Sequence, residues 1–218
     1  MQQRHIRIEV SGRYLVEVPD GDAPFPLLAG FHGYGQTAED QMALLRLIPG
    51  SEGWVRCSIE ALHPFMNSKG DPGASWMTRR ERELRIEENV RYVDAVLDAV
   101  RWDFPVEGLP VLHGISQGTG MACRAALLGR RHVAGVMLLG GDIPPELDGL
   151  RRMGQVQIAR GASDRFYPME RFEADRERLR DAGVAPDAVT FQGSHGPNAG
   201  YFAEAGRFLG TLGSGERA

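Results

Sequence analysis

Apolar residues along the chain follow two patterns, short continuous runs and longer segments with helical spacing. Continuous runs predict strands that are buried on both faces of a parallel sheet, at residues 27–31, 109–115 and 133–139. Shorter runs predict further strands, at residues 54–59, 155–159 and 188–192. Helical spacing and capping residues predict helices at about residues 37–48, 78–100, 169–182 and 199–212, with one more directly after residue 116. This alternation predicts an α/β fold with a mostly parallel sheet and helices on both faces.

Two segments depart from this alternation. Residues 4–10 and 13–19 alternate apolar and polar side chains on either side of Ser11-Gly12, which predicts a hairpin at the edge of the sheet. Residues 63–77 contain several prolines and glycines and predict a long irregular loop. The stretch after the strand at 133–139 has no insertion long enough for a helical cap, so we expect an open site without a large cap domain.

A glycine turn with a serine at its apex follows the strand at 109–115. Its sequence, Gly114-Ile115-Ser116-Gln117-Gly118, fits the G-x-S-x-G pattern of a nucleophile elbow. The pentapeptide alone is weak evidence, but here a predicted strand precedes it and a predicted helix follows it. Glycine on both sides of the serine allows the strand and the helix to pass close to each other. The pattern therefore predicts Ser116 as a nucleophile.

A serine hydroxyl becomes a good nucleophile only beside a base that an acidic group holds in place. Asp164 follows the predicted strand at 155–159, and His195 follows the strand at 188–192. Because the carboxyl ends of parallel strands meet at one edge of a sheet, both side chains are expected near Ser116. The order serine, aspartate, histidine is that of α/β hydrolases and differs from the two common protease orders.

The acidic position has one alternative. Asp142 also follows a predicted strand, one strand earlier in the chain, and has the reach to contact the histidine. The turn Asp164-Arg-Phe-Tyr-Pro168 favours Asp164, because it fixes this carboxylate at the end of a strand.

Charge that develops on a substrate oxygen needs N–H donors that are already in place. The backbone N–H of Gln117 is the first predicted donor, and that of Tyr34 in the turn His32-Gly33-Tyr34-Gly35 is the second. Apolar side chains in the surrounding loops are candidates for a substrate pocket. They are Phe65, Met66, Trp76, Met77 and Tyr167.

Composition excludes several other classes. The chain has 218 residues, which predicts one domain over 1–218, and its net charge of −4 argues against binding to nucleic acid or an anionic membrane. Its two cysteines, Cys57 and Cys123, are predicted to be buried free thiols. The histidines and cysteines lack metal-ligand spacing, and no nucleotide-binding glycine motif is present, so neither a metal nor a cofactor is expected. The absence of a signal peptide or a membrane-spanning stretch predicts a cytoplasmic protein, whose oligomeric state stays open between a monomer and a homodimer.

The chain resembles the phospholipase/carboxylesterase family of small α/β hydrolases, which includes acyl-protein thioesterases and is related to dienelactone hydrolases. The matching segments are Phe31-His-Gly-Tyr-Gly-Gln-Thr-Ala-Glu-Asp40, Gly114-Ile-Ser-Gln-Gly-Thr-Gly120, Gly161-Ala-Ser-Asp-Arg-Phe-Tyr-Pro168 and His195-Gly196. The resemblance implies a serine hydrolase that acts on small esters or thioesters without a cofactor. It also implies that Ser116, Asp164 and His195 form a catalytic triad, with Tyr34 and Gln117 as the oxyanion donors.

Hydrolysis through an acyl-enzyme on Ser116 is therefore the leading hypothesis for the function. Acyl transfer to an acceptor other than water would use the same three residues and is an alternative. A third possibility, from another class, is a binding protein with this fold and no catalytic activity.

Overall fold

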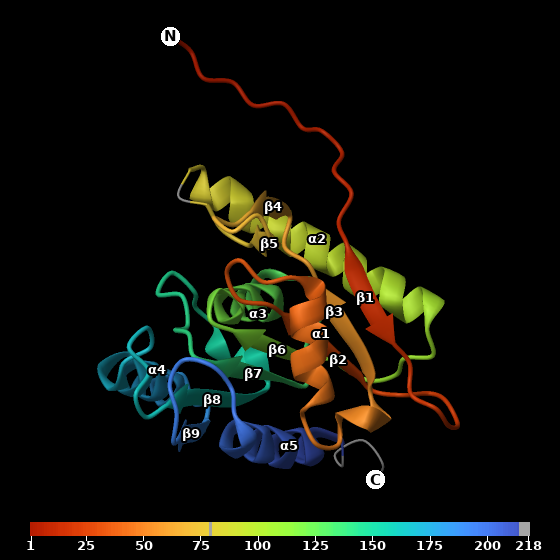
Figure 1. Cartoon of the computed structure of the whole chain (residues 1–218), viewed down its shortest axis with the longest axis vertical. Helices are drawn as coiled ribbons and strands as arrows, with labels where there is room; N and C mark the ends of the chain where they lie inside the picture. Colours follow the sequence, from red (N-terminus) through yellow and green to blue (C-terminus); the bar gives the residue numbers. More distant parts are fainter. Residues whose placement is uncertain (79, 214–218) are drawn as a thin grey trace.

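A seven-stranded sheet forms the centre of the molecule (Figure 1). The computed structural model describes residues 1–78 and 80–213. In spatial order the strands are β1 (Tyr14–Glu17), β3 (Val55–Ile59), β2 (Leu27–Phe31), β6 (Val111–Ile115), β7 (Gly135–Leu139), β8 (Gln155–Gly161) and β9 (Asp187–Phe191). β1 is antiparallel to β3, and the other neighbouring strands of this sheet are parallel. The prediction of a mostly parallel α/β sheet is confirmed.

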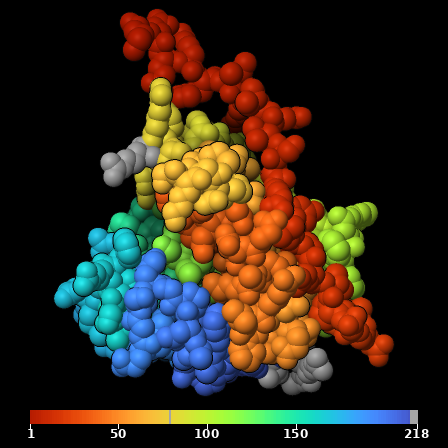
Figure 2. All heavy atoms as spheres, in the orientation of Figure 1, coloured from red at the N-terminus to blue at the C-terminus, as the bar shows by residue number. Residues whose placement is uncertain are grey.

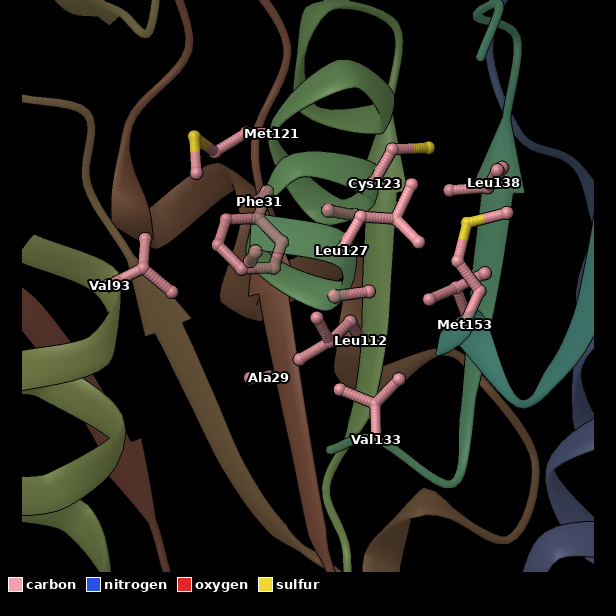
Figure 3. Close-up of a cluster of buried hydrophobic side chains, with 14 of the residues drawn as sticks. Ala29, Phe31, Val93, Leu112, Met121, Cys123, Leu127, Val133, Leu138 and Met153 are labelled. Carbon is pink, nitrogen blue, oxygen red and sulfur yellow. The ribbon is translucent and has the colours of Figure 1, made fainter. Parts of the chain in front are cut away.

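Helices cover both faces of the sheet. They are α1 (Ala38–Arg46), α2 (Arg82–Asp103), α3 (Gln117–Leu128), α4 (Met169–Asp181) and α5 (Ala199–Gly213), with short 3-10 helices η1 (Ser51–Gly53) and η2 (Leu150–Met153). One cluster of buried apolar side chains joins the sheet to α2, α3 and α4, and a second cluster joins it to α1 and α5. Figure 3 shows part of the first cluster, in which Phe31 and Leu112 of the sheet share the core with Met121 and Leu127 of α3.

The predicted strands that are most apolar are also the most buried. Every residue of β2, β6 and β7 is buried, as expected for central strands covered by helices on both sides. Both cysteines are free and buried, as the sequence predicts. Between β7 and β8 the chain forms only η2, so no helical cap covers this edge of the sheet. In the described ranges, no helix has the length and apolar content needed to cross a membrane.

The starts of α1 and α2 differ in how well the sequence predicts them. Thr37 caps α1 as expected: its side chain accepts a hydrogen bond from the N–H of Asp40, whose carboxylate accepts one from the N–H of Thr37. Thr78 does not cap α2, because its hydroxyl donates to the carbonyl of Arg80 at 2.8 Å. α2 instead follows Glu81, which has a left-handed backbone (φ 55°).

The predicted hairpin of residues 4–10 and 13–19 is wrong in its first half. Residues 14–17 form β1, but residues 4–10 form an extended segment that belongs to no strand (Figures 1 and 2). A two-residue hairpin turn needs a positive φ at its first residue or at both, and neither Ser11 nor Gly12 has one. Gly12 also packs so closely on Tyr92 that a β-carbon there would lie 2.0 Å from the ring.

The predicted loop at residues 63–77 is more regular than expected. It contains β4 (His63–Met66) and β5 (Pro72–Ser75), which pair as a short antiparallel hairpin. The hairpin is stabilised by the turn after β2: the N–H of Gly35 donates to the carbonyl of Ala74 at 2.9 Å, and the N–H of Ala74 donates to the carbonyl of Gln36 at 3.0 Å. These bonds place the hairpin beside the predicted oxyanion turn.

Candidate active site

Ser116 lies in a sharp turn between β6 and α3. Its backbone has φ 53° and ψ −117°, a conformation that non-glycine residues rarely adopt. The flanking glycines are required by close contacts: a β-carbon on Gly114 would lie 2.4 Å from the carbonyl oxygen of Gly118, and one on Gly118 would lie 2.0 Å from that of Phe31. The N–H of Ser116 donates to the carbonyl of Leu139 at 2.8 Å. The turn therefore presents this serine at the carboxyl end of the sheet.

Ser116, His195 and Asp164 form a continuous hydrogen-bonded chain. Nε2 of His195 lies 2.9 Å from Oγ of Ser116, and Nδ1 lies 2.9 Å and 3.1 Å from the two carboxylate oxygens of Asp164. A carboxylate only accepts hydrogen bonds, so the proton of a neutral His195 lies on Nδ1, and Nε2 accepts from the serine hydroxyl. This is the geometry that a general base needs beside a nucleophile.

Local hydrogen bonds orient the carboxylate of Asp164. It follows β8 in a tight turn, where its Oδ1 accepts from the N–H groups of Phe166 at 2.8 Å and Tyr167 at 3.0 Å. Its side chain is fully buried. Asp142, the alternative from the sequence, is about half exposed and forms an ion pair of 3.6 Å with Arg171. The structure thus brings Asp164, and not Asp142, to the imidazole.

Two residues fix the position of the imidazole ring. Gly140, at the end of β7, has φ 65°, and a β-carbon there would lie 3.2 Å from both Nδ1 and Cε1 of His195. The ring of Phe166 lies against His195, with 4.8 Å between ring centroids, and is itself 75 % exposed. Phe166 therefore forms an open apolar wall beside the base, which the sequence analysis did not identify.

The turn after β2 lies next to Ser116. A β-carbon on Gly33 would lie 3.5 Å from Cβ of Ser116. The N–H groups of Gly33, Gly35 and Gln36 all donate within the protein, whereas in the described part of the chain that of Tyr34 has no protein acceptor. Gln117 is the first residue of α3, so its N–H has no acceptor within the helix, and it lies at the positive end of the helix dipole.

The side chain of Gln117 connects the start of α3, where the backbone N–H of Gln117 lies, to the β4–β5 hairpin. Its Oε1 accepts from the N–H of Trp76 at 2.9 Å, and its Nε2 donates to Oγ of Ser75 at 3.1 Å. The indole N–H of Trp76 in turn donates to the carbonyl of His32 at 2.9 Å. The hairpin consequently links both predicted oxyanion donors, a role that no local pattern in the sequence indicates.

The predicted pocket residues divide into two groups. Trp76 and Tyr167 are fully buried, and the hydroxyl of Tyr167 donates to Asp175 at 2.7 Å, so both belong to the packed interior. Met77 is partly buried and packs against the core. Phe65 stacks on Tyr34 with 5.1 Å between ring centroids, and Met66 is largely exposed. Phe65 is therefore the predicted pocket residue that contacts the exposed ring of Tyr34.

Two other histidines near the site, His32 and His113, are buried and hydrogen-bonded within the protein. Nδ1 of His32 donates to the carbonyl of Gly33 at 2.7 Å, and Nε2 accepts from the N–H of Ala61 at 3.0 Å. His113 lies in β6, bonded to Gln41 at 3.0 Å and to Tyr201 at 2.8 Å. Burial lowers the pKa of both imidazoles, that of His113 to about 3. Across residues 1–78 and 80–213, no group of three His, Cys, Asp or Glu residues could hold a metal ion.

Solved structures share this architecture, although neither a protein-family model nor a curated protein sequence matches the chain. A carboxylesterase from Bacillus cereus is similar over 92% of this chain and 94% of its own, with 16% identity and a TM-score of 0.73. The esterase PE8 is similar over 93% and 100%, with 24% identity and a TM-score of 0.72. The Zea mays acyl-protein thioesterase 2 is similar over 93% and 99%, with 16% identity and a TM-score of 0.72. At these identities the likeness establishes the fold, which is the α/β-hydrolase fold.

Proposed function

We propose that the protein is a serine hydrolase of the phospholipase/carboxylesterase family, which cleaves small carboxylic esters or thioesters and acts as a single domain. The observation that carries the proposal is the hydrogen-bonded chain from Ser116 through His195 to Asp164. The names of the similar structures, two esterases and a thioesterase, support the same class of reaction.

The first half of the reaction forms an acyl-enzyme. Oγ of Ser116 attacks the carbonyl carbon of the substrate while its proton passes to Nε2 of His195. Asp164 keeps the other ring proton on Nδ1 and stabilises the imidazolium. The tetrahedral intermediate then collapses, and Nε2 returns its proton to the departing alkoxide or thiolate.

The second half regenerates the enzyme. Nε2 of His195 takes a proton from a water molecule, whose oxygen attacks the acyl carbon on Ser116. The second tetrahedral intermediate releases the carboxylic acid, and the proton returns to Oγ of Ser116. In both halves the N–H groups of Gln117 and Tyr34 donate to the negatively charged substrate oxygen.

The surroundings of Ser116 favour an apolar group on the substrate. Phe166 lies beside the base, and the exposed ring of Tyr34 packs against Phe65 at the oxyanion turn. In the described ranges, no helical cap separates these side chains from solvent. We expect the open site to accept esters with acyl chains of different lengths, without a closing movement of the protein.

A fluorophosphonate probe tests the proposal directly, because it reacts with an activated serine. The native protein should be labelled, and Ser116→Ala should abolish labelling. Ser68→Ala, in the exposed turn between β4 and β5, is the matched control and should label normally. A native protein that resists labelling and does not hydrolyse p-nitrophenyl esters contradicts the proposal and favours a binding protein with this fold. A labelled protein whose acyl group goes mainly to added alcohols rather than water favours acyl transfer.

A further inference from the structure

The outer edge of β1 has hydrogen-bonding groups without a strand beside them. β1 is the outermost strand of the sheet and, among the residues that the structure describes, pairs only with β3. The carbonyl of Arg13 accepts from the N–H of Glu60 at 2.9 Å, so odd-numbered residues of this strand direct their backbone groups towards β3. The backbone groups of Tyr14 and Val16 therefore point outwards. Such an edge is a template for another strand.

The segment before β1 has the pattern of a strand and no strand partner. Within residues 4–10, Ile6, Ile8 and Val10 alternate with polar side chains, which is typical of a strand with one buried face. These three side chains are 88%, 77% and 65% exposed. The segment contacts its own α2 through exposed polar groups, among them an ion pair of 3.7 Å between Arg7 and Glu87. Apolar residues repeated in this way on an extended segment indicate a surface that is covered by something else.

If residues 4–10 paired with β1 of the same chain through a turn at Ser11-Gly12, their polar face would lie against the core. A hairpin with Ser11-Gly12 as its turn places Val10 opposite Arg13, and therefore Ile8 opposite Leu15. Val16 and Tyr14 are the side chains of β1 that pack against the core, whereas Leu15 lies on the other face. Since neighbouring strands place opposite residues on the same face, this hairpin would align the polar residues of the segment with the core face.

The turn itself is also blocked. Gly12 has a negative or extended φ, and Tyr92 fills the space beside it, with the Tyr92 hydroxyl donating to the carbonyl of Arg13 at 2.8 Å. The chain therefore leaves β1 in an extended direction instead of reversing. A loop of three residues, Ser11 to Arg13, would give the correct face within one chain, but it needs a left-handed backbone at its third residue. Arg13 has no positive φ, and its carbonyl already accepts from Glu60 and Tyr92, so the partner that the structure leaves open is another molecule.

We propose that a second copy of this chain supplies that partner, through antiparallel pairing of residues 6–18 about a two-fold axis at Gly12. In this register Val10 of one copy lies opposite Tyr14 of the other, and Ile8 lies opposite Val16. All four side chains then share the face that packs against the core. The same segment carries both the added strand and the open edge, so one symmetric contact gives the outer edge of β1 a partner in both copies.

The oligomeric state tests the proposal without reference to catalysis. Sedimentation velocity should show twice the mass of one chain for the native protein. A variant lacking residues 1–10 should have the mass of one chain. Ile8→Lys should weaken the dimer by at least about tenfold in dissociation constant, because it places a charge on the shared apolar face. Gln2→Lys, which adds the same charge outside the paired residues, should not change it.

Disulfide trapping tests the register. In the proposed pairing Arg7 lies opposite Glu17 of the other copy, at a non-hydrogen-bonded position with a Cα separation of about 4.5 Å, which suits a disulfide. Arg7→Cys combined with Glu17→Cys should therefore give a covalent dimer. Ile6→Cys combined with Glu17→Cys is the matched pair, because these residues face each other only in the hairpin within one chain.

Three results would overturn the proposal. A native protein that sediments as a single chain at every accessible concentration excludes the dimer. A crosslink within one chain, in either double-cysteine variant, favours a hairpin. A dimer that survives removal of residues 1–10 shows that the contact lies elsewhere. Both native cysteines, Cys57 and Cys123, are buried and do not compete for the crosslink.

Discussion

The side-chain amide of Gln117 joins the residue after the candidate nucleophile to the backbone of Trp76, over a hydrogen bond of 2.9 Å. Trp76 continues the connection, since its indole N–H donates to the carbonyl of His32 at 2.9 Å. The N–H groups of Gln117 and Tyr34 therefore belong to one bonded unit, although the two residues lie far apart in the sequence. In an oxyanion site such a unit would fix the distance between the two donors.

Gln117→Leu should lower kcat while leaving KM almost unchanged. The variant retains the backbone N–H and a similar side-chain volume but loses the bonds to Trp76 and Ser75. Since loss of one oxyanion donor costs about 10²–10³ in kcat, a displaced donor should cost about 10–100-fold. Steady-state hydrolysis of a p-nitrophenyl ester measures both constants. Gln155→Leu, at the opposite end of the sheet, is the control, and equal kcat values in the two variants would contradict a positioning role.

Asp164→Asn should lower kcat by roughly four orders of magnitude, because an amide at this position no longer fixes the tautomer of His195. The fold should persist, since an asparagine oxygen still accepts from the N–H groups of Phe166 and Tyr167. Asp142→Asn is the matched control, because that carboxylate pairs with Arg171 on the surface. If Asp142→Asn is the variant that inactivates the protein, the acid is assigned to the wrong residue.

Gly140→Ala should reduce kcat because its β-carbon would lie 3.2 Å from the imidazole of His195. Its positive φ adds backbone strain of about 1–2 kcal/mol to the free energy of folding. Gly149→Ala separates the two effects, because Gly149 has φ 69° and nothing within 4 Å of its β-carbon position. Both variants should lose similar stability in urea unfolding, and only Gly140→Ala should lose activity. Equal activities would show that the contact does not position the base.

The sequence predicted those parts of the site that depend on local chemistry. Ser116 was found because a strand, a glycine turn and a helix follow one another in the chain, and Asp164 and His195 each come directly after a strand. The β4–β5 hairpin was missed because prolines and glycines interrupt its alternation, and its stability comes from bonds to Gly35 and Gln36.

The sequence pattern also does not predict that Trp76 is buried or that residues 4–10 are exposed, because both depend on contacts between distant segments. Trp76 is buried because its indole N–H reaches the carbonyl of His32, a contact between distant segments. Residues 4–10 alternate as a strand would, but the pattern does not specify whether a strand lies beside them, and in the structure they belong to neither sheet. Local periodicity predicts which face is apolar, and the partner of that face depends on the three-dimensional arrangement.

The buried imidazole of His113 should make the protein less stable in acid. Burial lowers its pKa from 6.5 to about 3, so between these values the unfolded chain binds a proton that the folded chain does not. The free energy of unfolding is therefore unaffected by His113 above pH 6.5, and it decreases by about 1.4 kcal/mol per pH unit as the pH falls towards 3. Burial also lowers the pKa of His32, so both histidines contribute to the loss of stability in acid. The contribution of His113 is therefore measured by urea unfolding of the native protein and a variant between pH 7 and pH 4.5. His113→Asn cannot titrate and should show a shallower loss of unfolding free energy over this range; an identical slope would mean that His113 is protonated in the folded protein.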